Sequence, residues 1–194
     1  MSERVVYLVR HGESEANRLG IMQGWHDSDL SDNGRQQAQA LHRWLGPYRV
    51  ISSDLARAYK TARLLTEFPE RVKTDRRLRE IHVGQWQGMQ KQQIVSSPRW
   101  QHYQNHPESF QFPQGETLGD VQTRMTAAFH DAVKDNDLPL VLVSHRVALR
   151  TLLVALAGKS LTEIHCYDLP NASVTRVHWT GSQAHILGVG ELPE

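Results

Sequence analysis

The sequence of 194 residues has little of what would point to a special class of protein. Its single cysteine, Cys166, cannot form an internal disulfide, which is typical of a reducing compartment such as the cytoplasm, and we expect its thiol to be partly buried. No apolar run approaches the length of about 20 residues that crosses a bilayer. The first apolar run follows Met1 so closely that we expect no signal peptide. These absences favour a cytoplasmic protein without a membrane anchor.

The chain also lacks an excess of charge of either sign. Its 22 basic and 21 acidic side chains give a net charge of +1 with histidine neutral. We therefore expect no broad basic face for nucleic acid, and any anion site must be local. With 39% hydrophobic residues, the composition is that of an ordinary globular protein, and the length fits one domain.

Apolar runs alternate with segments of helical spacing, which is typical of an α/β domain with a mostly parallel sheet. The expected strands are residues 4–9, 49–53, 139–144, 174–179 and 185–189. The expected helices are residues 34–45, a segment that begins after Asp54 as its N-cap, a segment that opens with a capping box at 117–120, and residues 147–157. We expect one domain over residues 1–194, a mixed, mostly parallel sheet with helices on both faces.

Residues 85–115 differ from the rest of the chain. They are rich in Gln, His, Trp and Pro and show no clean helical or strand period, so we interpret them as a small lid insertion. Its aromatic residues fit either a wall toward a substrate or the packing of the lid itself. His102 and His106 have the spacing of two ligands on one helical face, but no third ligand or adjacent glutamate accompanies them. We therefore predict no metal site there.

The most informative segment is residues 4–17, RVVYLVRHGESEAN. The apolar run Val5–Val9 ends in Arg10 and His11, so a buried strand brings a guanidinium and an imidazole to its carboxyl end, where α/β sheets bind ligands. A guanidinium fork suits phosphate oxygens, and a neutral imidazole can act as a nucleophile. Gly12 allows the backbone to turn sharply and to approach a ligand closely. The segment predicts a phosphoryl site.

Three further segments follow the same logic. Residues 50–54 end a strand, and Arg57 follows in the first turn of a helix. Residues 141–146 end another strand and place His145 at a helix N-terminus, a position favourable to anions. Glu80 lies just before the lid. The order of the chain therefore places several charged and titratable groups near one edge of the sheet.

Together these groups have the parts that phosphoryl transfer needs: cations for the equatorial oxygens, a nucleophile in line, and an acid for the leaving oxygen. Arg10, Arg57 and His145 would supply the charge. His11 would attack phosphorus. Glu80 would protonate the leaving oxygen and then activate the water that hydrolyses the phosphohistidine.

The motifs resemble those of the histidine phosphatase superfamily, also called phosphoglycerate mutase-like, and follow the family's order over nearly the whole chain. The matching stretches are LVRHGES at 8–14 with Asn17, the pair Gln23-Gly24, LSDNGRQQA at 30–38, SSDLARAYKTA at 52–62, LREIHVGQWQG at 78–88, PQGET at 113–117, VSHRVALR at 143–150 and LPNASVTRV at 169–177. The resemblance implies a mixed, mostly parallel sheet with a cap formed by residues 85–115, and neither a metal nor another cofactor.

The resemblance also implies roles for individual residues. It implies that His11 is the phosphorylated nucleophile and that Glu80 is the proton donor. The phosphate pocket would consist of Arg10, Arg57 and His145, with Asn17 as a further donor. Gln23 and Gly24 would line the substrate side. Ser14 is expected to support the loop or the phosphate by hydrogen bonding. One residue departs from the pattern, because Arg146 stands where the family usually has glycine. This arginine would add a positive contact, point to solvent or crowd the pocket.

The favoured function is a metal-independent phosphatase for small phosphorylated metabolites. A phosphoglycerate mutase stays an alternative, although the chain looks short of the insertion and tail that mutases of the family use. A non-enzymatic alternative is a phospho-ligand binding protein, with turnover lost because of Arg146. An esterase is a third, because Gly12–Ala16 nearly matches the G-x-S-x-G elbow with Ser14 as nucleophile, but Ala16 breaks the motif. The substrate and the oligomeric state stay open.

Overall fold

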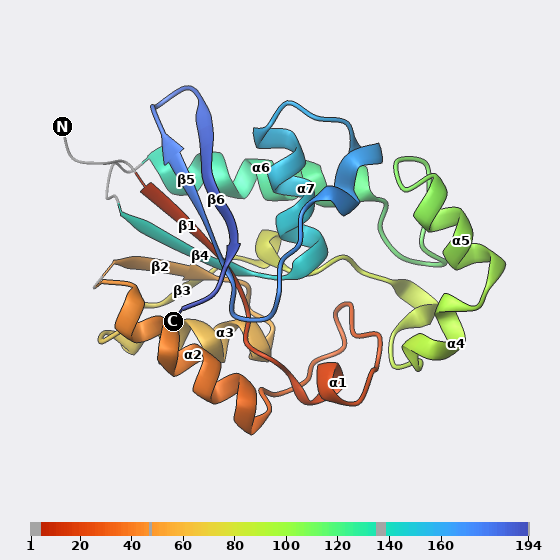
Figure 1. The fold of residues 1–194 in the computed structure, drawn as a ribbon, viewed down its shortest axis with the longest axis horizontal. Helices are drawn as coiled ribbons and strands as arrows, with labels where there is room; N and C mark the ends of the chain where they lie inside the picture. Colours follow the sequence, from red (N-terminus) through yellow and green to blue (C-terminus); the bar gives the residue numbers. More distant parts are fainter. Residues whose placement is uncertain (1–4, 47, 135–138, 194) are drawn as a thin grey trace.

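A computed structural model describes residues 5–46, 48–134 and 139–193. Its centre is a six-stranded sheet in the order β3-β2-β4-β1-β5-β6 (Figure 1). The strands are β1 (Val5–Arg10), β2 (Arg49–Ser52), β3 (Lys73–Thr74), β4 (Leu140–Ser144), β5 (Val174–Trp179) and β6 (Ala184–Glu191). The first four pair in parallel, and β5 runs antiparallel to both β1 and β6. The expected mixed, mostly parallel sheet is confirmed.

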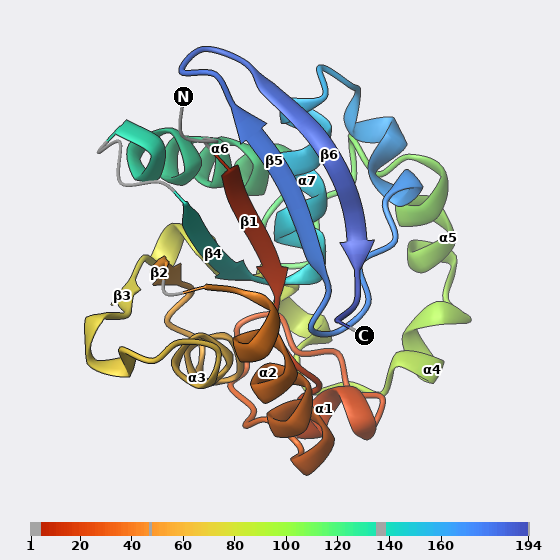
Figure 2. The same ribbon diagram turned by 60° about the vertical axis from the view of Figure 1, so that its left-hand side comes forward.

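Helices cover both faces of this sheet, as Figure 2 shows. The α-helices are α1 (Glu15–Arg18), α2 (Asp32–Trp44), α3 (Ala56–Leu64), α4 (Lys91–Val95), α5 (Pro98–Asn105), α6 (Leu118–Lys134) and α7 (Arg146–Leu156). Short 3-10 helices span Pro69–Arg71, Arg76–Leu78, Gly84–Trp86 and Leu161–Cys166. Along β4, Leu140 and Leu142 belong to one core cluster with α6 and α7, whereas Val141 and Val143 belong to a second cluster with α2 and α3. The alternation of strand side chains thus divides the core between the two faces.

The predicted positions of the long helices and strands are confirmed, but some of their predicted first and last residues are wrong. β4 begins at Leu140, α2 begins at Asp32, and β6 extends on both sides of the predicted run; the predicted strand start at Arg4 lies outside the described residues. The short elements α1 and β3 were not predicted, because four and two residues carry no measurable period.

The two predicted helix caps had different outcomes. The N-cap at Asp54 is wrong: Leu55 is the N-cap residue of α3 and makes no side-chain cap bond. Both carboxylate oxygens of Asp54 instead accept hydrogen bonds from Arg79, each at 2.6 Å. A bidentate pair with a guanidinium gives the carboxylate two charged donors, and a backbone amide at a cap is a neutral donor, which explains the difference. The capping box is confirmed, since the Thr117 hydroxyl accepts from the Asp120 amide at 3.1 Å and the Asp120 carboxylate accepts from the Thr117 amide at 2.9 Å.

The cap segment, residues 85–115, contains α4 and α5 and lies at one end of the domain (Figure 1). Its helices have five and eight residues, too short to give a clear helical period in the sequence. It is held by a cluster of aromatic rings. The ring centroids of Trp86 and Phe112 are 5.3 Å apart, and those of Tyr103 and Phe110 are 5.5 Å apart. This packing gives the cap segment a small apolar core of its own.

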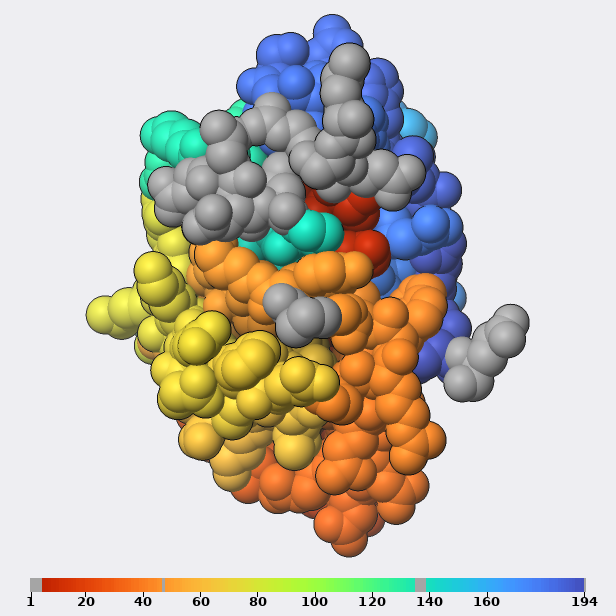
Figure 3. Space-filling model, turned by 90° about the vertical axis from the view of Figure 1, so that its left-hand side faces the viewer, coloured from red at the N-terminus to blue at the C-terminus, as the bar shows by residue number. Residues whose placement is uncertain are grey.

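The carboxyl ends of β1, β2 and β4 meet at the edge of the sheet that faces the cap segment. Figure 3 shows the opposite end, where the starts of β1 and β4 lie between the orange segment and the blue strands β5 and β6. Among the described residues, no helix combines the length and the apolarity needed to cross a membrane. The expectation that Cys166 is partly buried is wrong. Cys166 is the last residue of the 3-10 helix Leu161–Cys166, and it is exposed.

Candidate active site

His11 follows the last residue of β1 and is 3% exposed. Its backbone amide donates to the Ser144 carbonyl at 3.0 Å, which fixes it beside the end of β4. Its Nδ1 lies 2.6 Å from the Gly12 carbonyl oxygen. Because a carbonyl oxygen only accepts, Nδ1 carries the proton in this arrangement, and Nε2 keeps its lone pair. Burial and the charges of Arg57 and Arg10 hold the pKa of His11 well below its usual range, which favours the neutral form that a nucleophile requires.

Arg10 and Arg57 are buried, with 8% and 1% of their surface exposed. Among the described residues, each donates to carbonyl oxygens only: Arg10 to Leu169 at 2.7 Å, and Arg57 to Gly24 at 2.7 Å and His26 at 3.2 Å. Their Nε atoms have no hydrogen-bond partner in this part of the chain. Burial lowers the pKa of both guanidiniums to about 10, so both stay charged at neutral pH.

The counter-charge with the largest effect on these two cations in the described residues, the Glu80 carboxylate, acts on both without a direct salt bridge. Within the described ranges, neither forms an ion pair with a carboxylate. A buried charge without a partner is costly, and a bound anion removes that cost. The arrangement is therefore that of an anion site at the carboxyl ends of the strands.

His145 is the N-cap residue of α7 and is fully buried. Its Nε2 is 2.8 Å from the Ser53 hydroxyl, and its Nδ1 has no partner among the described residues. Its ring centroid lies 5.0 Å from that of His11. Burial and the Arg57 charge hold the pKa of His145 well below its usual range. The second imidazole is thus brought beside the first, as the sequence predicted.

The Glu80 carboxylate lies at the N-terminus of α7. Its Oε1 accepts from the Ile81 and Ala148 amides at 2.9 and 3.0 Å, and its Oε2 accepts from the Val147 amide at 3.2 Å. This corrects the expectation that the N-terminus of α7 is open to a bound anion. The first-turn amides of Val147 and Ala148 bond to Glu80, so they are not free to hold an outside anion.

Gly12 has a packing role that the sequence did not predict. A Cβ at this position would lie 2.5 Å from the Gly34 carbonyl oxygen, and a Cβ on Gly34 would lie 1.9 Å from the Glu13 carbonyl oxygen. The two glycines therefore let the loop after β1 pack directly on the start of α2. Glycine is needed here for contact between two backbones, and the expected approach to a ligand stays a prediction.

The polar residues after this loop form a connected network. The Ser14 hydroxyl lies 3.0 Å from both Asn17 Oδ1 and Gln23 Oε1 and donates its single hydrogen to one of them at a time, and Asn171 Nδ2 donates to Asn17 Oδ1 at 3.3 Å. Ser14 is fully buried and does not line the cavity, whereas Asn17, Gln23 and Gly24 do. The expected supporting role of Ser14 in the loop agrees with these bonds, and its burial disfavours the serine esterase alternative.

A cavity of about 470 Å³ opens above His11, between α7 and the cap segment. It is lined by Arg10, His11, Asn17, Ile21, Met22, Gln23, Gly24, Arg57, Glu80, Ile81, Val83, Lys91, Val95, Trp100, Tyr103, Gln104, Phe112, Arg146, Val147, Arg150 and His165. The structure thus brings one edge of the sheet and the cap segment around one space. Of the aromatic residues considered for a substrate wall, Trp100 and Tyr103 line it and Trp86 packs behind them.

Arg146 lies on the cavity wall, with 46% of its side chain exposed. Two further cations there, Lys91 and Arg150, were not singled out from the sequence. Arg150 follows Arg146 by four residues, a helical spacing that places both on one face and that was visible in the sequence. Lys91 lies in the irregular segment, where no pattern indicated it.

The basic run at residues 76–79 points away from this cavity. Arg77 pairs with Asp75 and Asp131, each at 2.7 Å, and Arg79 pairs with Asp54. None of these arginines lines the cavity. Across the described ranges, no group of three or more His, Cys, Asp or Glu side chains is placed to hold a metal ion.

Comparison with known proteins agrees with this geometry. The family model of the histidine phosphatase superfamily (branch 1) matches residues 6–191. Phosphoserine phosphatase 1 of Hydrogenobacter thermophilus is 34% identical over 179 residues, which cover 88% of this chain and 84% of that protein. A probable phosphoglycerate mutase GpmB of an Enterobacter species is 33% identical over 185 residues, or 91% of this chain and 86% of that one.

A solved structure, Bacillus stearothermophilus YhfR, superposes on the model with a TM-score of 0.88 at 32% identity, covering 97% of each chain. Family match, relatives and fold agree over almost the full length. The prediction made from the ordered motifs is confirmed. The chain therefore belongs to branch 1 of the histidine phosphatase superfamily.

Proposed function

We propose that this histidine phosphatase hydrolyses small phosphomonoesters without a metal ion, through a phosphohistidine on His11. The observation that carries the proposal is the pair of buried arginines, Arg10 and Arg57, which flank a neutral histidine and have no carboxylate partner among the described residues. A phosphoryl group placed between these arginines would supply the missing negative charge. The named phosphatase among the relatives supports the same reaction class.

In the first step, the Nε2 lone pair of His11 forms a bond to phosphorus while the bond to the leaving oxygen breaks. The Nδ1–H bond to the Gly12 carbonyl fixes the ring and supports the positive charge that the ring gains. Arg10, Arg57 and His145 stabilise the charge on the equatorial oxygens.

Glu80 gives its proton to the leaving oxygen in this step. Its Oε1 already accepts two hydrogen bonds, and Oε2 accepts one, so Oε2 has the capacity left to carry the transferred proton. In the second step, Glu80 takes a proton from water as the water oxygen bonds to phosphorus. The P–N bond then breaks, which releases phosphate and restores neutral His11.

The test is phosphate release from a panel of phosphomonoesters with EDTA present, comparing wild type with His11→Ala. We expect turnover in the wild type only, because His11 is the imidazole that lies beside the two buried arginines. A variant that keeps turnover, or a wild type that EDTA inactivates, would contradict the proposal. Vanadate should inhibit the wild type, since it adopts the five-coordinate geometry of the transition state.

A mutase is the second candidate, because a relative named as a probable phosphoglycerate mutase is 33% identical over most of the chain. Both reactions begin with the same phosphohistidine. They differ in the acceptor, which is water for a phosphatase and a second hydroxyl of the substrate for a mutase. Product analysis separates them, because only the phosphatase releases inorganic phosphate in proportion to the substrate consumed.

The substrate that we propose is a small phosphorylated metabolite, in keeping with the cavity volume of about 470 Å³. The cap segment forms one of the cavity walls, and we assign the choice of substrate to it. We place the enzyme in the cytoplasm, on the ground that its single cysteine suits a reducing compartment.

A further inference from the structure

The contribution of His145 to the reaction depends on which of its ring nitrogens carries a proton. The ring is fully buried and its pKa is held well below the usual range, so it is neutral and has one N–H and one lone pair. An N–H can donate to a phosphoryl oxygen, whereas a lone pair facing that oxygen would repel it. The position of one proton therefore decides whether this ring assists the proposed reaction or opposes it.

The Ser53 hydroxyl lies 2.8 Å from Nε2 of His145, and the sheet fixes both residues. Ser53 follows the last residue of β2, and His145 follows the last residue of β4, which is paired with β2 (Figure 1). The Ser53 amide donates to the Val143 carbonyl at 2.9 Å, so the serine is tied to the strand that ends just before His145. Ser53 has no exposed surface. The contact is thus built on two adjacent strand ends and is closed to solvent.

The other bond of the Ser53 hydroxyl indicates the direction of this contact. Its oxygen accepts from the Leu55 amide at 3.3 Å, and among the described residues Nε2 of His145 is the one acceptor within reach of its hydrogen. If Nε2 carried the ring proton, the serine hydrogen and the Nδ1 lone pair would both be buried without a partner. If the serine donates to Nε2, only the Nδ1–H is unpaired. Since unpaired buried polar groups are costly, the second arrangement is favoured.

The unpaired Nδ1 of His145 lies in the same region as two other unpaired nitrogens. The Nε atoms of Arg10 and Arg57 are also buried without a partner among the described residues. Arg57 is the charge with the largest effect on the His145 ring, and the His11 ring lies 5.0 Å away between centroids. A phosphoryl group bound at His11 would bring acceptor oxygens to a region that has donors and no free acceptor for them.

We propose that Ser53 is a positioning residue, whose hydroxyl donates to Nε2 of His145 and so keeps the ring proton on Nδ1, where it donates to an oxygen of the reacting phosphoryl group. The inference rests on the proposed function, since it assumes that this phosphoryl group lies at His11. His145 then contributes a neutral hydrogen bond to the equatorial oxygens, and the positive charge there comes from Arg10 and Arg57.

Nitrogen-15 NMR of the imidazole rings tests the proton position directly, because protonated and unprotonated ring nitrogens resonate far apart. His145→Asn assigns the signals of this ring by their loss. At neutral pH we expect the wild-type proton on Nδ1. In Ser53→Ala, Nε2 loses its donor, so the form with the proton on Nε2 should appear, since the partner of one ring nitrogen sets the state of the other. A wild-type proton on Nε2, or an unchanged ring in Ser53→Ala, would overturn the proposal.

The matched control is Ser52→Ala. Ser52 is the neighbouring serine and is equally buried, but its hydroxyl donates to the Ser53 carbonyl at 2.8 Å and makes no hydrogen bond to His145. Ser53→Ala should lower kcat for an aryl phosphate by roughly 10- to 100-fold, the worth of one hydrogen bond to a charged group. Ser52→Ala should keep the wild-type proton position and most of the rate. Equal losses in the two variants would show a structural role only and overturn the proposal.

Two substitutions of His145 test which ring nitrogen is the donor. The amide nitrogen of Asn is as many bonds from Cα as Nδ1, whereas that of Gln is one bond further, as Nε2 is. His145→Asn should therefore retain more turnover than His145→Gln, and the reverse order would contradict Nδ1 as the donor. The NMR result does not depend on turnover. A wild type that releases phosphate with its proton on Nε2 overturns the role of Ser53 alone, whereas a wild type that hydrolyses no phosphomonoester overturns the proposed function.

Discussion

At the scale of single residues, the site depends on which groups donate and which accept each hydrogen bond. His11 is oriented by one carbonyl and His145 by one hydroxyl, and both are neutral because burial and nearby guanidiniums disfavour the protonated ring. Within the described ranges, the hydrogen bonds of Arg10 and Arg57 go to carbonyl oxygens, which orient the guanidiniums without cancelling their charge. A neutral nucleophile between charged arginines is the combination that phosphoryl transfer requires.

The residue whose role is most open to a kinetic test is Glu80. If Oε2 protonates the leaving oxygen, Glu80→Gln should lower kcat by roughly 100-fold or more for alkyl phosphates, whose leaving oxygen is strongly basic. Aryl phosphates need less protonation and should lose much less. Rates for a series of leaving groups measure this directly, and equal losses across the series would contradict the role of Glu80 as acid.

At the scale of elements, the contact between the loop after β1 and the start of α2 holds His11 in place. Gly34→Ala would place a Cβ 1.9 Å from the Glu13 carbonyl oxygen, so the loop next to His11 must move. We expect a loss of about 1–3 kcal/mol in the free energy of unfolding, together with reduced turnover. Urea unfolding and aryl phosphate hydrolysis measure the two effects.

The control for this change is Gly119→Ala in the first turn of α6. Its added Cβ would meet nothing closer than the Thr117 hydroxyl at 3.7 Å, an ordinary contact. Alanine has the better helix propensity by about 1 kcal/mol, so this variant should be as stable as the wild type or more stable. If both variants lose the same stability, the loop contact is not the cause.

At the scale of the whole molecule, stability should depend on pH through the buried histidines. The folded state holds the pKa values of His11 and His145 well below the ordinary value of 6.5, so the unfolded chain binds protons first as pH falls. Their contribution is fully present above about pH 6.5 and is lost below it, by about 1.4 kcal/mol per pH unit for each histidine.

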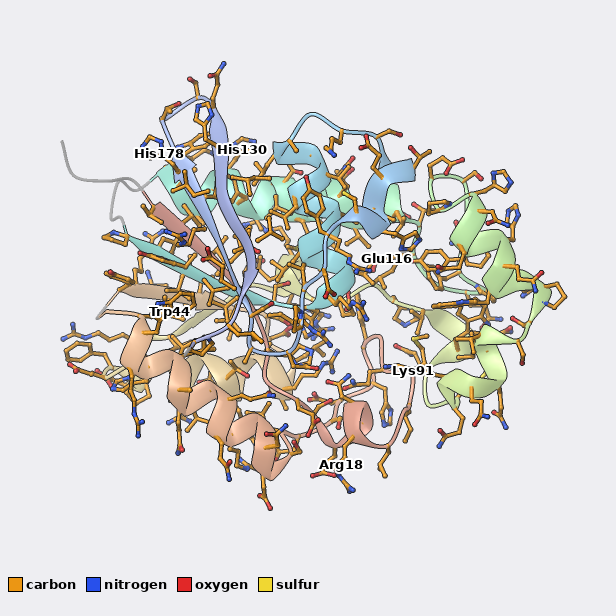
Figure 4. All side chains as sticks on the ribbon, in the orientation of Figure 1. Arg18, Trp44, Lys91, Glu116, His130 and His178 are labelled. Atoms are coloured by element: carbon orange, nitrogen blue, oxygen red, sulfur yellow. The ribbon has the colours of Figure 1, made fainter. Side chains whose placement is uncertain are left out.

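Urea unfolding between pH 7 and pH 5 tests this dependence. His145→Asn should remove about one proton from the slope, because asparagine does not titrate. His130→Asn, at an exposed position on α6 far from the site in Figure 4, serves as the control and should leave the slope unchanged. A wild-type stability that does not fall over this range would contradict the buried neutral state of the pair.

The sequence by itself determined most of the sheet, its main helices and which residues meet at one edge of the sheet, because strand and helix periods are local and because the ends of parallel strands must share one edge. Arg10, His11, Arg57 and His145 lie close together for this reason, and their catalytic roles stay predictions.

Tertiary structure alone decided what depends on distant pairings. Arg79 pairs with Asp54, and the backbone at Gly34 packs on Gly12 and leaves no room for a side chain there. Lys91 lines the cavity from a segment with no clear helical or strand period. None of these contacts is local in sequence: each follows from how loops and the cap segment pack on the finished sheet, and packing depends on three-dimensional proximity that no local pattern encodes.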